Sequence, residues 1–182
     1  MILGIVGMIG SGKSTYARQY NAEHFSGKAK ICEADSIGHE ILKNTLFQNR
    51  LRNQFGNDIF SSLGNIDRNV LREKACRSAS ALSDLEKIVH PLLKKELLHI
   101  LRPYRKTEDV LFMVVALPFS LGLFEYFDEY ISLSVEKEEA WIRIQNRSPN
   151  ISRKQFEVFW KRQEREYSLS DNSKNEGIFP LI

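Results

Sequence analysis

The sequence predicts an α/β fold in which helices flank a parallel sheet. Residues 1–6 and 110–117 are apolar without alternation, as strands buried on both faces of a parallel sheet are. Much of the chain between them has the spacing of apolar residues that is typical of helices. The 182 residues, 42% of them hydrophobic, are enough for one domain whose core needs no disulfide or structural metal.

The first part of the chain predicts two strands and then a helical region. The strand over 1–6 ends in glycines, and a helix is expected over 13–23. A second strand is expected over 29–32, and the region 36–101 is mostly helical, with breaks at glycines. Within this region, residues 83–86 (Ser-Asp-Leu-Glu) have the pattern of a capping box and predict the start of a helix.

The second part predicts two more strands, each followed by polar breaks. The strand over 110–117 stops at a proline, and another strand covers 130–135. A helix is expected over 137–146. A last helix should start at Ser152, whose hydroxyl can cap it together with Gln155. Helical spacing predicts core positions in this last helix for Phe156, Phe159 and Trp160.

Composition and charge exclude several kinds of partner. The net charge of +3 is too small for a nucleic-acid-binding protein, although a sequence pI near 8.8 allows a basic groove for phosphates. The two cysteines form no CxxC pair, which predicts reduced thiols. The N-terminus has no basic segment before its apolar residues, and the apolar segment 110–119 is about half as long as a membrane span. We therefore expect a cytoplasmic protein with no nucleic-acid or membrane partner and an oligomeric state that the sequence does not predict.

Residues 7–14, Gly-Met-Ile-Gly-Ser-Gly-Lys-Ser, fit the P-loop pattern G-x-x-x-x-G-K-[ST] without a mismatch. They stand between a predicted strand and a predicted helix, where backbone N–H groups and the positive end of the helix can surround a triphosphate. Lys13 would reach the β and γ phosphates as a catalytic residue, and the Ser14 hydroxyl would ligate Mg²⁺. The expected nucleotide-binding residues are Gly10, Ser11, Gly12, Lys13, Ser14 and Thr15.

Other residues must separate motors, switch GTPases and kinases, because all of them use a P-loop. An N-K-x-D element for guanine is absent, and the strand over 110–117 has no acidic residue of the kind that holds Mg²⁺ in motor ATPases. Asp35 instead ends the second predicted strand, at the edge where open α/β sheets bind ligands. It would face the γ phosphate of ATP and accept the proton of an acceptor hydroxyl, unless it only caps the helix that begins near Ser36.

Arg143 and Arg147 lie four residues apart, on one face of a predicted helix that ends at a proline-containing break. They could close onto the phosphates as part of a lid. Arg143 would then be a catalytic residue that stabilises the transferred phosphoryl group, and Arg147 would bind the nucleotide. The alternative is a solvated basic face.

Three further segments follow the P-loop in order: 33–40 (EADSIGHE), 66–68 (IDR) and 85–91 (LEKIVHP). With them the chain resembles dephospho-CoA kinases over nearly its whole length. The resemblance implies a P-loop nucleoside triphosphate hydrolase fold of the kinase type, with a helical substrate-binding insertion and a short lid. It also implies transfer of the γ phosphate of ATP to the ribose 3′-hydroxyl of dephospho-CoA, the last step of coenzyme A synthesis.

The same resemblance implies roles for individual residues. Asp35 would be the base and would contact the substrate. Arg68 and His90 would help to hold the acceptor, with Asp67 orienting Arg68. Without the resemblance, these last residues would be interpreted as a surface ion pair and a histidine at a helix end.

The chain departs from the family pattern at three places. Glu33 stands where the family has the first Asp of D-A-D, and the segment 118–122 (PFSLG) ends in Gly122 where the family's P-L-L-x-E has an acidic residue. Residues 170–177 are only faintly similar to the family's A-D-y-v-I-x-N-x-G, so we expect altered contacts to adenine.

We expect a single P-loop kinase domain over 1–182. Its nucleotide-binding core would comprise 1–35 and 102–146, its helical acceptor region 36–101, and its lid with the following helix 147–167. The alternatives are another small-molecule P-loop kinase, of the shikimate type, and a nucleotide-binding module that has lost catalysis.

Overall fold

A parallel sheet of four strands forms the centre of the computed structural model, which describes residues 1–168. The strands are β1 (Ile2–Gly7), β2 (Lys30–Glu33), β3 (Leu111–Val115) and β4 (Glu129–Leu133). Their order across the sheet is β2-β3-β1-β4, and every pair of neighbours is parallel. The predicted parallel sheet is therefore confirmed, with strand bounds one or two residues from those expected.

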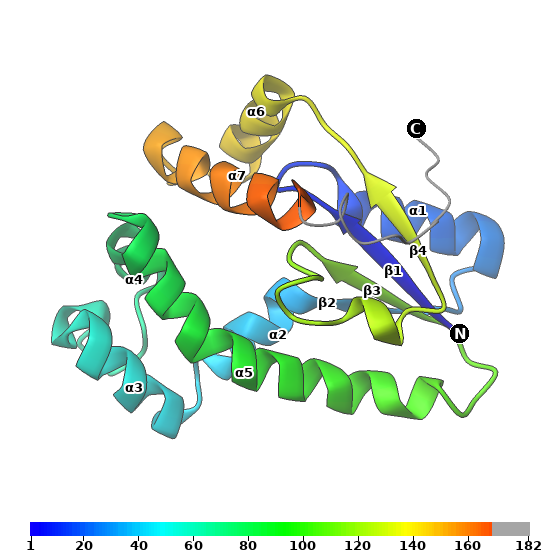
Figure 1. The fold of residues 1–182 in the computed structure, drawn as a ribbon, viewed down its shortest axis with the longest axis horizontal. Coiled ribbons are helices and arrows are strands. Elements are labelled where there is room, and N and C mark those ends of the chain that lie inside the picture. The colour runs from blue at the N-terminus through cyan, green and yellow to red at the C-terminus, as the bar shows by residue number, and fades with distance from the viewer. Residues whose placement is uncertain (169–182) are drawn as a thin grey trace.

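Helices cover both faces of the sheet (Figure 1). Leu3 and Ile5 of β1 pack toward α1 (Lys13–Phe25) in one apolar cluster. Ile2 and Val6, which point to the opposite face, belong to a larger cluster with the long helix α5 (Ala79–Tyr104). Burial on both faces explains why β1 and β3 read as continuous apolar runs.

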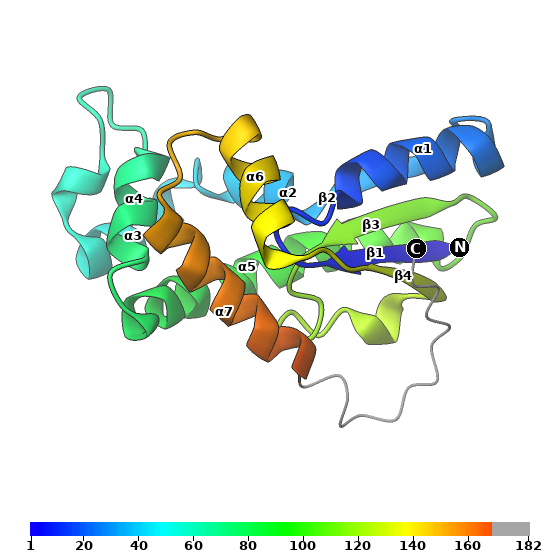
Figure 2. The same cartoon turned by 90° about the horizontal axis from the view of Figure 1, so that it is seen from above.

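The region between β2 and β3 is helical, as predicted. It contains α2 (Ala34–Ile41), α3 (Thr45–Phe55), the short 3₁₀ helix η1 (Asn57–Ile59), α4 (Arg68–Ala75) and α5. Both cartoon views place α3 and α4 at the end of the molecule that is far from the N-terminus (Figures 1 and 2). One apolar cluster runs without interruption from the sheet into these helices.

The predicted helix start at residues 83–86 is wrong, because α5 begins earlier. Ser78 is its N-cap, and the Ser78 hydroxyl accepts a hydrogen bond from the backbone N–H of Ala81 at 3.1 Å. Residues 83–86 therefore lie inside the helix. Leu82, just before this segment, is buried in the core, and packing of this kind extends the helix back to its cap at Ser78.

The chain after β3 passes through the 3₁₀ helix η2 (Phe124–Tyr126) and β4 into α6 (Lys137–Arg147) and α7 (Arg153–Ser168). The predicted capping box at the start of α7 is confirmed. The Ser152 hydroxyl accepts from the Gln155 N–H at 3.2 Å, and the Gln155 side chain accepts from the Ser152 N–H at 2.9 Å. Phe156 and Trp160 are buried between α6 and α7, as expected. Phe159 also packs against the core, but it is only partly buried and lines a cavity.

Within residues 1–168, no helix combines the length and apolarity that a membrane crossing requires. The segment 170–177, for which altered adenine contacts were expected, lies outside the described residues.

Candidate active site

The P-loop connects the carboxyl end of β1 to the N-terminus of α1. Gly10 and Gly12 have positive φ angles of 80° and 86°, which favour glycine strongly over other residues. At Gly10 there is also no room for a side chain, since a Cβ atom there would lie 2.8 Å from atoms of Ala140 in α6. The loop therefore keeps its backbone curled below α6, with Gly12 as the N-cap of α1.

Lys13 lies above this loop with its ammonium group turned inward. Its Nζ donates to the carbonyl oxygen of Met8 at 2.7 Å and to Ser11 Oγ at 3.4 Å. Burial lowers the pKa of Lys13 to about 8, and the Arg147 charge adds to this effect, while the carboxylate of Asp35 opposes it. A partly buried cation held in this way is suited to an anionic ligand.

Ser14 and the end of β2 supply a second group of oxygen atoms. Ser14 Oγ donates to Glu33 Oε2 at 2.9 Å, and Glu33 Oε1 accepts from Arg18 Nη2 at 2.9 Å. Asp35 lies two residues further on and lines the same cavity as Ser14 and Glu33. A hydroxyl and two carboxylates are hard oxygen ligands of the type that Mg²⁺ prefers, so these residues fit a magnesium ion.

A cavity of about 910 Å³ lies between the P-loop, α2, α5, α6 and α7. It is large enough for a ligand of nucleotide size. Of the residues that the sequence predicted for the site, this cavity collects Gly10, Ser11, Gly12, Lys13, Ser14, Thr15, Asp35, His90, Arg143 and Arg147. These residues come from four separate helices and one loop, so the fold alone brings them together.

Asp35 is the second residue of α2 and is not its cap. The N-cap is Glu33, and no side chain caps this helix. Asp35 is exposed and lines the cavity, and its charge opposes the fall that burial causes in the pKa of Lys13. The alternative that Asp35 only caps a helix is therefore wrong.

The two arginines of α6 both line the cavity, and one of them contacts the P-loop. Arg143 Nη1 donates to the carbonyl oxygen of Gly10 at 3.1 Å, and its Nη2 pairs with Glu139 at 2.5 Å. Arg147 lines the cavity, and its charge lowers the pKa of Lys13. Both side chains are exposed and both line the cavity, so the predicted lid role and the alternative of a solvated basic face both remain.

The residues to which the family resemblance assigned the acceptor do not all lie at the cavity. His90 lines the cavity, and burial lowers its pKa. Arg68 is exposed at the start of α4 and is not among the cavity-lining residues. Asp67 does not pair with Arg68 within the described residues; its Oδ1 caps α4 by accepting from the N–H groups of Asn69 and Val70 at 2.9 and 3.2 Å.

Arg72 and His39 also line the cavity, although neither residue was given a role from the sequence. Arg72 lies one helical turn after Arg68, on the face of α4 that turns toward the cavity. His39 lies one turn after Asp35 on α2, and burial together with the charge of Arg68 lowers its pKa. The four-residue spacing from predicted residues was the available signal for both.

Helix α7 also supplies groups that the sequence analysis missed. Gln163 Oε1 accepts from the backbone N–H of Ile9 at 2.5 Å, and Tyr167 Oη accepts from the N–H of Gly7 at 2.6 Å. The Tyr167 hydroxyl also donates to the carbonyl oxygen of Ala116 at 3.3 Å. No local motif marks these residues, because their partners lie far away in the sequence.

A P-loop on a parallel sheet, a carboxylate facing its lysine and arginines above it define a small-molecule P-loop kinase. The solved structure of a dephospho-CoA kinase from Campylobacter jejuni has the same fold: the TM-score is 0.60 at 22% identity, with 98% of this chain and 85% of that chain covered.

Sequence comparison gives the family. The family model for dephospho-CoA kinase matches residues 1–172. A dephospho-CoA kinase from Fusobacterium nucleatum is 30% identical over 100% of this chain and 95% of its own length. Another, from Dehalococcoides mccartyi, is 31% identical over 85% of this chain and 76% of its own length. The chain belongs to the dephospho-CoA kinase family, which excludes the shikimate-type alternative.

Proposed function

We propose that the protein binds ATP with Mg²⁺ at the P-loop and transfers the γ-phosphoryl group to the ribose 3′-hydroxyl of dephospho-CoA. Family membership supports the reaction. One observation carries the assignment of residues: Lys13 and Asp35 line one cavity, and the Asp35 charge partly offsets the fall that burial causes in the pKa of Lys13. Phosphate binding and deprotonation of an alcohol need this pairing of a cation with a base.

The P-loop holds the phosphates. Its backbone N–H groups and the N-terminus of α1 bind the anion, and Lys13 exchanges its contact with the Met8 carbonyl for the β and γ oxygens. Ser14, Glu33 and Asp35 would hold Mg²⁺ directly or through water. When bound, the ion neutralises charge on the β and γ phosphates.

Asp35 acts on the acceptor. Its carboxylate accepts the proton of the ribose 3′-hydroxyl as that oxygen bonds to the γ phosphorus and the bond to the β-phosphate oxygen breaks. Arg143 and Arg147 stabilise the negative charge on the moving phosphoryl group and exclude water, which would otherwise hydrolyse ATP.

The other end of the cavity holds the rest of the acceptor. His90 and Arg72 reach it directly, and Arg68 acts from the rim. A neutral imidazole and a guanidinium suit a ligand that carries both ribose hydroxyls and a diphosphate. We also assign the reaction to the cytoplasm, since Cys32 and Cys76 are both unpaired and buried.

Incubation of the purified protein with Mg-ATP and dephospho-CoA tests the proposal. We expect coenzyme A and ADP in equal amounts, measured by mass spectrometry and a coupled ADP assay. Lys13→Ala is the control for contaminating kinases and should lose the activity. ATP binding without coenzyme A formation would favour the alternative of a nucleotide-binding module that has lost catalysis.

A further inference from the structure

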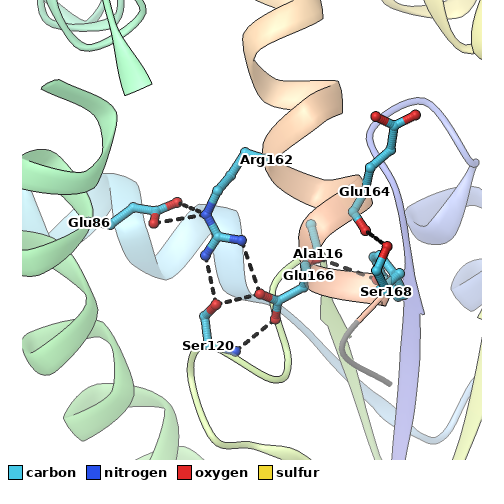
Figure 3. A network of polar contacts seen from close by, with 8 residues as sticks. Glu86, Ala116, Ser120, Arg162, Glu164, Glu166 and Ser168 are labelled. Atoms are coloured by element: carbon cyan, nitrogen blue, oxygen red, sulfur yellow. Dashed lines mark hydrogen bonds and ion pairs between the residues drawn. The ribbon is translucent and has the colours of Figure 1, made fainter. Parts of the chain in front are cut away.

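Four polar side chains form a network that joins α5, α7 and the loop after β3 (Figure 3). Glu86 comes from α5, Ser120 from the loop between β3 and η2, and Arg162 and Glu166 from α7. None of the four lines the cavity. We call this group the Arg162 network.

Glu166 is the buried end of the network, with 0% of its surface exposed. Its Oε1 accepts from the backbone N–H of Ser120 at 2.7 Å, and its Oε2 accepts from the Ser120 hydroxyl and from Arg162 Nη1, the latter at 3.1 Å. Fully buried carboxylates are rare, because removal from water is costly unless every lone pair finds a donor. This one is satisfied, and its partners fix the loop at Ser120.

Arg162 joins all the members. Its Nε donates to both carboxylate oxygens of Glu86, at 2.8 and 2.9 Å, and its Nη2 donates to Ser120 Oγ at 2.6 Å. One planar guanidinium thus bridges α5, α7 and the loop after β3. A lysine could replace the charge but not this set of directed bonds.

Each element that the network joins supplies cavity-lining residues beside it. His90 follows Glu86 by one helical turn on α5, and Leu121 is the next residue after Ser120. Phe159 and Gln163 flank Arg162 on α7, and Gln163 reaches the P-loop through Ile9. The network therefore lies where it can set the distance between the acceptor residues and the nucleotide loop.

The loop itself lacks an acidic residue at Gly122, where the family pattern has one. Gly122 has a φ angle of +57°, and a Cβ atom there would lie 2.7 Å from Nζ of Lys94 in α5. The carboxylate that the loop binds comes from α7 instead, as Glu166. The contact between the loop and α7 thus uses a residue that is distant in sequence.

We infer that Arg162 and Glu166 are positioning residues for the phosphoryl acceptor, because they hold α5, α7 and the loop after β3 around the acceptor end of the cavity. This inference rests on the proposed function. Charged networks of this kind add little net stability over apolar residues of the same shape, but they fix one arrangement. The effect of the network should therefore concentrate on binding of dephospho-CoA.

Steady-state kinetics of Arg162→Met, with Arg165→Met as the matched control, test the inference. Arg165 lies exposed on the same helix and outside the network. We expect Arg162→Met to raise the KM for dephospho-CoA by about tenfold or more, with the KM for ATP within about twofold, since small displacements of binding groups have such effects. Arg162→Lys should lie between the wild type and Arg162→Met.

Glu86→Gln tests the same network in a protein that keeps Arg162, so it remains a test if Arg162→Met fails to fold. Together with the double variant Glu86→Gln/Arg162→Met, it completes a double-mutant cycle. We expect the KM for dephospho-CoA of the double variant to be no higher than that of Arg162→Met, because the two residues act as a unit. Thermal unfolding of each variant reports on folding. Equal rises of both KM values, or additive losses in the cycle, would overturn the inference. A wild-type protein that forms no coenzyme A would instead overturn the proposed function.

Discussion

Arg143 Nη1 lies 3.1 Å from the carbonyl oxygen of Gly10, so a side chain from α6 rests on the loop that receives the phosphates. The contact satisfies the guanidinium only in part, and its other nitrogen pairs with exposed Glu139. A bound γ phosphate would offer stronger acceptors a short movement away. In the proposed mechanism, this contact holds Arg143 beside the phosphate site before the nucleotide binds.

Replacement of Arg143 should slow phosphoryl transfer far more than it weakens ATP binding. We expect Arg143→Met to lower kcat by about 10²-fold or more, as loss of an arginine at a transferred phosphoryl group does. Lys154→Met, on the exposed side of α7, is the control. Stopped-flow single turnovers would measure the step directly, and an unchanged rate would remove Arg143 from the reaction.

Two glycines with similar backbone angles should respond differently to alanine. Gly10 has φ +80°, and a Cβ atom there would meet Ala140, whereas Gly27 has φ +74° and open space around it. We expect Gly10→Ala to displace the loop and abolish binding of a fluorescent ATP analogue. Gly27→Ala should cost about 1 kcal/mol of stability and keep nucleotide binding. Equal binding by both variants would show that α6 does not constrain the loop.

Asp67 and Arg68 are adjacent, yet we assign them separate tasks. Asp67→Ala should lower the free energy of unfolding by about 1 kcal/mol, since it removes the cap of α4, and Asp67→Asn should restore most of it. Arg68→Ala should leave stability unchanged and raise the KM for dephospho-CoA. Urea unfolding and steady-state kinetics on the three variants distinguish the roles, and a destabilised Arg68→Ala would argue against them.

The protein should become less stable as the pH falls below about 6.5. Burial lowers the pKa of His39 and His90 from the ordinary value of 6.5, so the unfolded chain binds more protons just below that pH. As the pH falls from 6.5 to the pKa of the folded state, each histidine therefore stabilises the unfolded chain more and more relative to the folded protein. His90 faces Glu86, Arg162 and Glu166, whose opposed charges contribute less than burial.

Urea unfolding at pH 7.5 and pH 5.5 measures this effect. His90→Gln should reduce the loss of stability between the two pH values, and His99→Gln, exposed on the same helix, should not. Identical pH profiles for the wild type and His90→Gln would contradict the lowered pKa of His90.

The sequence predicted those features whose cause is local. The P-loop, the apolar strands β1 and β3 and the capping box at Ser152 each follow from residues close together in the chain. The start of α5 was missed because the helix extends back to a cap at Ser78, where the packing of residues such as Leu82 against the core stabilises it. Local patterns do not contain that information.

The contacts of α7 could not be predicted for the same reason. Gln163 binds Ile9 and Tyr167 binds Gly7, across more than 150 residues of sequence. Phe159 packs against the core as expected, but it is only partly buried, because the face of α7 that it shares with Gln163 also turns toward the cavity. Helical spacing shows that these residues share a face, and only the docking of the helix shows what that face meets.

The central claim is that Asp35 accepts the proton of the acceptor hydroxyl, and single-turnover transfer by Asp35→Asn tests it most directly. The asparagine keeps the shape of the side chain and removes the base. With saturating Mg-ATP and dephospho-CoA, we expect a rate at least about 10²-fold below that of the wild type, with ATP still bound. A wild-type rate in a variant that binds both substrates would contradict the account.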